Sequence, residues 1–205
     1  MENVREHIIE AAAEKMRAVG IKSISVDDIC RQLGISKKTF YVYFETKDEL
    51  IRALLRRHES GIEEAVHKQA EGKTVLELML GFMTLANCVK DVRKDPPLLY
   101  DLQKYYPQLF NEHTAKVREI SIRLLQYYLR KGQEEGFFRS DLDIDKTARV
   151  VAYIHHEMVN NLPQVKDEEK EVFVDHAKYA VDILMRGIIS DEGKREVKNR
   201  VEKHS

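Results

Sequence analysis

Basic and hydroxyl-bearing side chains gather in a short stretch near the amino terminus of this 205-residue chain. Lys37, Lys38 and Thr39 are consecutive, and Tyr41 and Tyr43 follow within about one further helical turn. Lysine ammonium groups donate hydrogen bonds to guanine O6 and N7, while hydroxyl groups donate to phosphate oxygens. The stretch therefore predicts a short helix that contacts the major groove of DNA.

The spacing of the apolar residues divides this helix into two faces. Phe40 and Phe44 are four residues apart and are expected to point inward, which leaves Lys37 and Lys38 outward in the first turn. Lys47, at the start of the next helix, would add a positive charge beside the phosphates. The tyrosines could instead pack at the junction with that next helix. The predicted DNA-contacting residues are Lys37, Lys38, Thr39, Tyr41, Val42, Tyr43 and Lys47.

The preceding segment supplies a partner helix that can hold the lysine-bearing one in place. Ser25 and Asp28 have the spacing of a capping box, and the apolar residues of 26–33 recur at helical spacing on one face. Gly34 then allows a tight turn, and Ser36 caps the following helix. Two short helices joined in this way predict a helix-turn-helix.

The remainder of the chain also has helical periodicity, and no segment shows sustained alternation of the kind that strands show. We therefore predict an all-α fold of about nine helices. It comprises an N-terminal three-helix head and a C-terminal helical body for ligand binding and dimerisation. The expected divisions are a DNA-binding head at 1–46, a connector helix at 47–70, a body at 71–190 and a frayed or weakly helical polar tail at 191–205.

Charge and composition restrict the classes of function. The net charge is −1, but residues 36–57 carry six basic and three acidic side chains, an excess of +3 on the predicted DNA-contacting segment. No apolar run is long enough to cross a membrane, and we expect a cytoplasmic protein without membrane association. The two cysteines, Cys30 and Cys88, lie in apolar helical patterns and are expected to be free buried thiols rather than a disulfide.

The run LGISKKTFYVYFETKDEL at 33–50 resembles the DNA-binding head of the TetR family of bacterial transcriptional regulators, and the likeness covers roughly residues 5–55. The resemblance implies a homodimer on a palindromic operator. It also implies that Lys37, Lys38 and Tyr41 contact bases, while Thr39, Tyr43 and Lys47 contact phosphates. It also implies a body that binds a small-molecule effector and moves the heads, most often to release a repressor. Lys38 stands where many members have a small residue, so we expect a different base preference.

The last two long helices are expected to form the dimer interface. Apolar and small residues recur along both at heptad-like spacing, which suits a four-helix contact between two protomers. The same stripes could instead pack into the protomer's own core. The predicted interface residues are Ala148, Val151, Val172, Phe173, His176, Ala177, Ala180, Val181, Leu184 and Ile188.

An effector pocket is expected among the helices of the body, with apolar walls and a few polar groups. The effector is predicted to be apolar or aromatic, because aromatic and thioether side chains dominate the candidates. Each candidate could equally be an ordinary core residue. The predicted lining residues are Phe82, Met83, Leu99, Tyr100, Gln103, Phe110, Tyr127, Tyr128, His155 and Met158.

Two other classes of function compete with a regulator. A helical enzyme could use the His155-His156-Glu157 run, but the sequence has no zinc-protease, paired-cysteine or nucleophile-elbow pattern. A helical adaptor without a DNA role is the other alternative. We expect neither catalysis nor a resident metal or cofactor.

Overall fold

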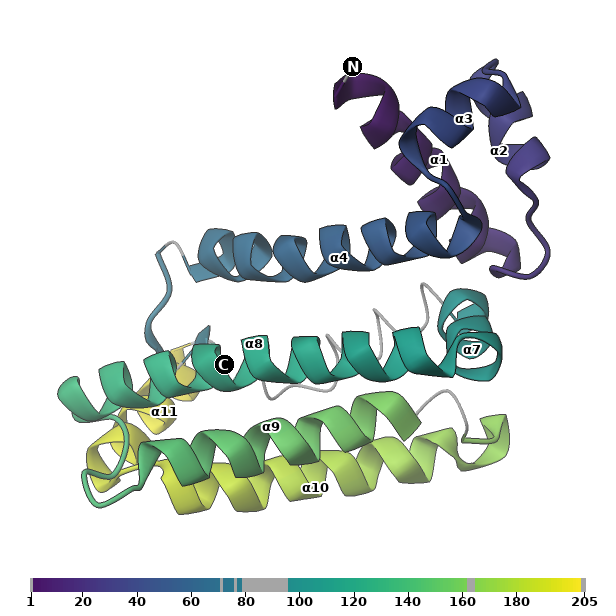
Figure 1. Ribbon diagram of the computed structural model, residues 1–205. Coiled ribbons are helices and arrows are strands. Elements are labelled where there is room, and N and C mark those ends of the chain that lie inside the picture. The colour runs from purple at the N-terminus through teal and green to yellow at the C-terminus, as the bar shows by residue number, and fades with distance from the viewer. Residues whose placement is uncertain (1, 71, 76, 79–95, 162–164, 204–205) are drawn as a thin grey trace. The chain divides into compact units, whose positions relative to one another are not determined.

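The computed structural model describes residues 2–70, 72–75, 77–78, 96–161 and 165–203. Those residues are almost entirely helical, and no strand occurs among them, so the predicted all-α class is confirmed (Figure 1). A short 3₁₀ turn, Asp167–Glu169, precedes the last long helix. The α-helices described are α1 (Glu2–Val19), α2 (Val26–Leu33), α3 (Lys37–Tyr43), α4 (Lys47–Ala70), α7 (Pro96–Tyr105), α8 (Pro107–Glu134), α9 (Ile144–Asn161), α10 (Lys170–Ile188) and α11 (Asp191–Lys203).

The chain divides into two compact units, Met1–Ala65 with Arg93–Val117, and Val66–Val92 with Arg118–Ser205. In the first unit, the three short N-terminal helices and α4 surround one apolar core. Leu98 and Leu102 of α7 and Leu109 of α8 belong to that core as well. The N-terminal head therefore shares its core with a helix that the sequence had placed in the body.

Polar contacts support the packing of α7 against the turn after α1. The backbone N–H of Lys22 donates to Asp101 Oδ2 at 2.8 Å. The Lys22 ammonium group lies over the Tyr105 ring, 4.5 Å from its centroid. Tyr106, directly after α7, is half-buried and packs against the same core.

Ion pairs tie α4 to its neighbours within the same unit. Arg57 contacts Glu10 of α1 at 2.7 Å, and Arg52 pairs with Glu112 of α8. His113 of α8 is buried, and its Nδ1 lies 2.8 Å from a carboxylate oxygen of Glu59. The connector helix is thus fixed along much of its length by contacts on two sides.

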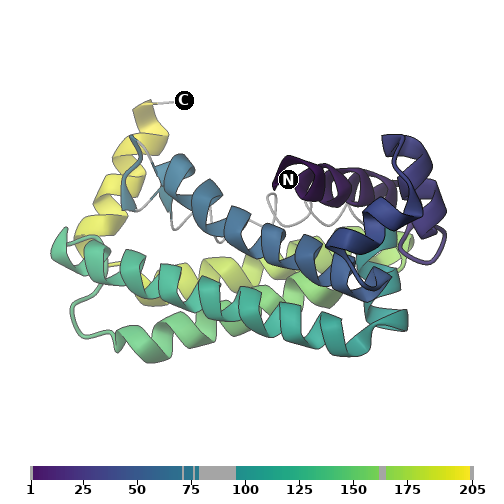
Figure 2. The same ribbon diagram turned by 45° about the horizontal axis from the view of Figure 1, so that its top comes forward.

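The second unit is built from the later turns of α8 with α9, α10 and α11. The helices α9 and α10 run antiparallel alongside each other (Figures 1 and 2), and their inward residues meet Leu125 and Leu129 of α8 in a second core. Phe138 enters this core from the turn after α8. None of the described helices is long and apolar enough to span a membrane.

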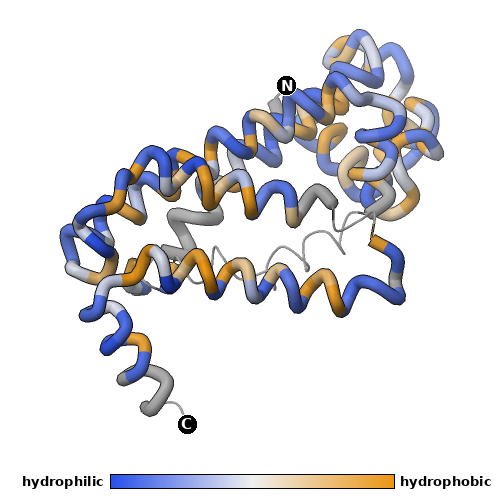
Figure 3. The backbone as a smooth tube through the Cα atoms, turned by 90° about the horizontal axis from the view of Figure 1, so that it is seen from below, coloured by the Kyte–Doolittle hydropathy of each residue, from blue (hydrophilic) through white to orange (hydrophobic). Residues whose placement is uncertain are grey.

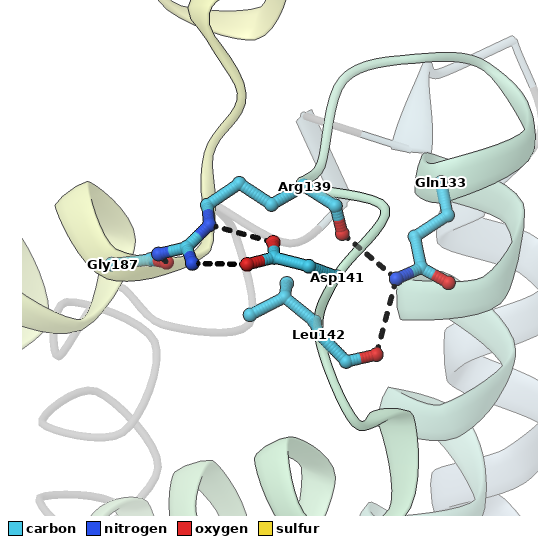
Figure 4. A network of polar contacts seen from close by, with 5 residues as sticks. All are labelled: Gln133, Arg139, Asp141, Leu142 and Gly187. Carbon is cyan, nitrogen blue, oxygen red and sulfur yellow. Dashed lines mark hydrogen bonds and ion pairs between the residues drawn. The ribbon is translucent and has the colours of Figure 1, made fainter.

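The turn between α8 and α9 is held by a network of hydrogen bonds (Figure 4). Gly136 adopts φ 77°, a left-handed conformation that favours glycine, and ends α8. Arg139 makes two contacts with the Asp141 carboxylate and donates to Gly187 O of α10. Gln133 Nε2 donates to the carbonyl oxygens of Arg139 and Leu142, so the loop is anchored to α8 and, through Arg139, to α10.

The tail that was predicted to be frayed or weakly helical forms the helix α11. Ser190 caps the helix, because its Oγ accepts from Gly193 N at 3.0 Å and donates to Gly136 O at 2.6 Å. Gly193 lies against Phe137 O so closely that a Cβ there would stand 2.3 Å from it. Val197 packs on the second core, although the helix is mostly hydrophilic (Figure 3).

Candidate nucleic-acid interface

The helix α2 is fixed at both ends by its own sequence. Ser25 Oγ accepts from Asp28 N at 3.2 Å, and Asp28 Oδ2 accepts from Ser25 N at 2.9 Å, which completes the predicted capping box. Gly34 ends the helix at φ 65°. Hydrogen bonding by Ser25 lowers the pKa of the Asp28 carboxyl group. The capping charge is thereby kept at the positive end of the helix dipole.

The helix α3 is anchored by two phenylalanines and one serine. Phe40 and Phe44 are 0% and 1% exposed, and their ring centroids are 5.8 Å apart. Ser36 Oγ accepts from Thr39 N at 3.0 Å and caps the helix. As predicted, the phenylalanines point inward, so the opposite face of α3 is turned to solvent.

The solvent-facing side of α3 presents a mixed basic and apolar surface. Lys37 and Lys38 are exposed in the first turn. Tyr41 is 51% exposed and Val42 is 72% exposed, which is high for apolar side chains. This combination offers donors for base edges together with an apolar group for a thymine methyl.

The remaining predicted contacts are more constrained. Thr39 is half-buried, and its hydroxyl oxygen lies 2.9 Å from Ser36 Oγ. Tyr43 is half-buried and packs against the first core. The sequence had allowed this placement as the alternative to a phosphate contact. Tyr41, by contrast, stays on the open face, with its ring edge-on to Phe40.

Lys47 occupies a different environment from the one that the sequence predicted. Its Nζ donates to Ile21 O at 2.6 Å and also to Ile24 O, inside the turn between α1 and α2. Burial lowers the pKa of this lysine, although nearby carboxylates partly offset the effect. The ammonium group therefore donates two hydrogen bonds to backbone carbonyl groups of the turn. A phosphate contact would have to use its one remaining N–H group.

Two acidic residues of the first unit, and the contacts that they make, were missed by the sequence reasoning. Asp27 of α2 lies 2.8 Å from Lys37 Nζ, and this contact raises the pKa of the lysine. Asp101 of α7 accepts from Lys22 N, as described above. The first pair joins two different helices and the second pair is 79 residues apart in the chain, so no local spacing rule could have paired them.

Comparisons with known proteins identify the head. Residues 8–54 match the family described as "Bacterial regulatory proteins, tetR family". The HTH-type transcriptional regulator EthR of Mycolicibacterium smegmatis is 40% identical over 67 residues, which cover 30% of this chain and 31% of the relative. The N-terminal head is thus similar to that of TetR-family regulators. The chain is a DNA-binding transcriptional regulator.

Longer alignments extend the TetR-family likeness into the body. The fatty acid metabolism regulator protein of Bacillus subtilis is 25% identical over 190 residues, covering 88% of this chain and 93% of that protein. A TetR-family regulator from Pectobacterium atrosepticum shares the fold with a TM-score of 0.72 at 14% identity, over 93% and 96% of the two chains. One from Haloarcula marismortui gives 0.71 at 19% identity, over 93% and 100%.

The predicted dimer stripe divides between the core and the surface of the second unit. Four of its residues are at most 3% exposed within a single protomer and pack into the protomer's own core, the alternative that the sequence had left open: Ala148, Val151, Ala177 and Ile188. Four more are half-buried, namely Phe173, Ala180, Val181 and Leu184, while Val172 and His176 are exposed. The exposed large apolar residues of these two helices, which we call together the α9–α10 face, are Val150 and Tyr153 of α9 and Val172, Tyr179 and Ile183 of α10.

The predicted pocket residues are scattered over both units. Phe82 and Met83 lie outside the described residues. In the first unit, Tyr100 and Gln103 are exposed, while Leu99 and Phe110 are half-buried. In the second unit, Tyr127 is 56% exposed and Tyr128 is 4% exposed, and the half-buried members are His155 and Met158. The structure thus makes Tyr128 a core residue.

An open hollow of about 580 Å³ in the second unit was not predicted. It lies at the turn after α8 and the start of α11, beside the network of Figure 4. Its charged groups are already paired, Arg139 with Asp141 and Lys194 with Asp191. In the part of the chain that the structure describes, no group of three or more His, Cys, Asp or Glu is placed to hold a metal ion, and Cys30 is a free buried thiol.

Proposed function

We propose that this protein is a TetR-family repressor that binds a palindromic operator as a homodimer through α3 and leaves it when a small-molecule effector binds. The observation that carries the proposal is the two-faced α3. Its inner face is fixed by Phe40 and Phe44, and its outer face exposes Lys38, Tyr41 and Val42. A rigidly anchored short helix with donors in its first turn is suited to reading base edges.

A second copy of the chain is the proposed partner of the α9–α10 face. Tyr179 and Ile183 of α10 are four residues apart, and they are 67% and 54% exposed, respectively. Val172, in the first turn of the same helix, is also exposed. Val150 and Tyr153 extend the apolar surface on α9. A patch of this kind on two antiparallel helices can pair with its own copy about a twofold axis and form a four-helix contact.

The proposed effector is an apolar or aromatic small molecule. One relative that aligns over most of the chain is named for the regulation of fatty acid metabolism, which supports an apolar effector and target genes of that kind. Half-buried Met158 and His155 in the second unit remain candidate contacts. We propose that the effector acts on DNA binding through α7, because that helix shares a core with α1.

The proposal is tested with the purified full-length protein and a randomised DNA library. We expect recovery of a palindromic duplex, with binding that weakens steeply as salt rises, because cationic contacts release counterions from DNA. Native mass spectrometry of the protein as purified, followed by binding titrations with any small molecule detected, tests the effector. Absence of any preferred duplex would overturn the DNA-binding proposal. Unchanged DNA affinity in the presence of a bound molecule would overturn the effector proposal.

A further inference from the structure

We propose that Asp27 is a positioning residue for base recognition, which holds the Lys37 ammonium group at the base-reading face of α3 and so sharpens discrimination between DNA sequences. The inference rests on the proposed DNA-binding role of α3. Lys37 Nζ lies 2.8 Å from Asp27 Oδ1, although the two residues belong to different helices. Both side chains are exposed, 60% for the lysine and 48% for the aspartate.

The Asp27–Lys37 ion pair is expected to contribute little to the stability of the fold. Ion pairs between exposed side chains add almost nothing to folding free energy, because solvent screens them and ordering the chains costs entropy. A carboxylate is also unfavourable beside DNA, since it is repelled by the phosphates that the neighbouring lysines attract. Asp27 therefore reduces general affinity for DNA, and its contribution has to come from what it does to Lys37.

The chemistry of lysine explains what the contact can do. A lysine ammonium group is a compact charge on a flexible stem, and an unrestrained one is drawn to whichever phosphate is nearest. Such contacts carry no sequence information. Of its three N–H donors, the contact with Asp27 uses one, which leaves two for base acceptors such as guanine O6 and N7. The carboxylate thus restrains the Lys37 side chain and leaves two of its N–H donors available for bases.

Lys38 offers an internal contrast. It is the next residue on α3 and is also exposed to solvent, yet it forms no ion pair or hydrogen bond within the described residues. The two lysines therefore differ in restraint rather than in charge. We expect Lys37 to contribute mainly to discrimination and Lys38 to contribute more to general affinity.

The experiment compares the wild type with Asp27→Asn on two duplexes. The first is the duplex that the wild type selects from a randomised library, and the second carries a single base-pair change at its most strongly preferred position. We expect Asp27→Asn to lose about tenfold in the affinity ratio, within the range that one good base contact provides. Binding to the altered duplex should strengthen, with a salt slope steeper by about 0.9 because one more phosphate is contacted.

Glu45→Gln is the matched control, because Glu45 is an exposed carboxylate of the same head and its backbone N–H is held by Glu49 whatever its side chain does. It should leave the affinity ratio unchanged. A double-mutant cycle with Lys37→Ala then separates positioning from a general effect of charge. In the Lys37→Ala background, Asp27→Asn should have no further effect on the ratio. Asp27→Ser serves as a second variant, and denaturant unfolding checks that each variant is folded.

An unchanged ratio in folded Asp27→Asn would overturn the inference. So would an equal loss with Glu45→Gln, or the same loss in the presence and absence of Lys37. If the wild type selects no duplex at all, the proposed DNA-binding function fails instead, and the two failures are distinguishable.

Discussion

The ring of Phe138 occupies the space beside Gly132 in which any other residue would place its Cβ. An ideal Cβ on Gly132 would stand 2.1 Å from Phe138 Cδ2 and 2.3 Å from Cε2. The ring is 2% exposed and sits in the second core, and Phe138 N donates to Gly132 O at 3.1 Å. A glycine inside α8 is therefore the reason that the chain can fold back onto that helix immediately after it ends.

Replacement of Gly132 by alanine should destabilise the protein. The added methyl group must displace Phe138 or bend α8, and overpacking of this kind costs about 1–3 kcal/mol. The better helix propensity of alanine returns about 1 kcal/mol, so the net loss should reach up to about 2 kcal/mol. Urea unfolding followed by circular dichroism measures the change in midpoint.

Gly61→Ala is the control for helix propensity alone. Gly61 lies in α4 with nothing within 4 Å of an added Cβ, so this change should stabilise the protein by up to about 1 kcal/mol. If the two glycine variants shift the unfolding midpoint in the same direction, the close approach of Phe138 is not what excludes a side chain at position 132.

Local signals in the sequence account for how well the head could be predicted. Ser25 with Asp28, Gly34, and Phe40 with Phe44 each act within a few residues, and each has the contact that its spacing predicts. The packing of α7 depends instead on contacts such as Lys22 with Asp101, which lie far apart in the chain. Periodicity identifies a helix near 98–104, but it carries no information about which core receives that helix.

The same limit applies to α10 and α11. Both faces of α10 carry apolar residues, so periodicity could not decide that Ala177 turns inward while Tyr179 remains exposed. The tail contains almost no apolar residues, and its helix depends on Ser190 as a cap and on the contact of Gly193 with the turn after α8. Composition alone therefore predicted a frayed or weakly helical tail where tertiary contacts stabilise a helix.

Replacement of Lys38 by alanine should weaken DNA binding without affecting folding. The side chain is exposed on the outer face of α3, so the free energy of unfolding should be unchanged. Binding to all duplexes should weaken, and the salt slope should fall by about 0.9 for each phosphate that the lysine neutralises in the wild type. Fluorescence anisotropy at several salt concentrations measures both quantities. A variant with the wild-type salt slope would show that Lys38 does not touch the DNA backbone.

Replacement of Lys47 by alanine should act mainly on folding. The carbonyl groups of Ile21 and Ile24 would be deprived of a partly buried donor, which should cost about 1–3 kcal/mol in unfolding free energy. Urea unfolding provides the measurement, with Lys38→Ala as the control for removal of a lysine from the same head. If the Lys47 variant has wild-type stability and a reduced salt slope of DNA binding, Lys47 contacts a phosphate, as the sequence predicted.

A charge on the α9–α10 face should dissociate the proposed homodimer without unfolding the protomer. Tyr179 is 67% exposed in the single chain, so Tyr179→Glu should leave the second core intact. Burying a carboxylate at the centre of the contact should weaken dimerisation by about 2 kcal/mol or more, which is about thirtyfold in Kd. Analytical ultracentrifugation measures the association state.

Val19→Glu is the matched control for this experiment, because Val19 is a similarly exposed apolar residue of α1 in the other unit. It should sediment as the wild type does. If Tyr179→Glu also leaves the association unchanged, the partner of the α9–α10 face is not a second copy of this chain.

Acid should destabilise the protein in part through His155. Burial, with a smaller contribution from the neighbouring His156, lowers the pKa of His155 from 6.5 to about 4. The unfolded chain therefore binds a proton near pH 6.5 that the folded protein does not bind until about pH 4. Stability should fall as the pH is lowered through this interval, by at most about 3.5 kcal/mol from this group, since one pKa unit corresponds to about 1.4 kcal/mol.

His155→Gln removes the titrating group while keeping a polar side chain of similar size. Carboxyl groups also titrate in this interval, but they do so in both proteins, so the difference between the two stability curves isolates the histidine. We expect the variant to lose less stability than the wild type between pH 6.5 and pH 4, measured by urea unfolding at each pH. His176→Gln, which changes an exposed histidine of α10, should follow the wild-type curve. Parallel curves for the wild type and His155→Gln would mean that His155 is protonated in the folded protein as readily as in the unfolded chain.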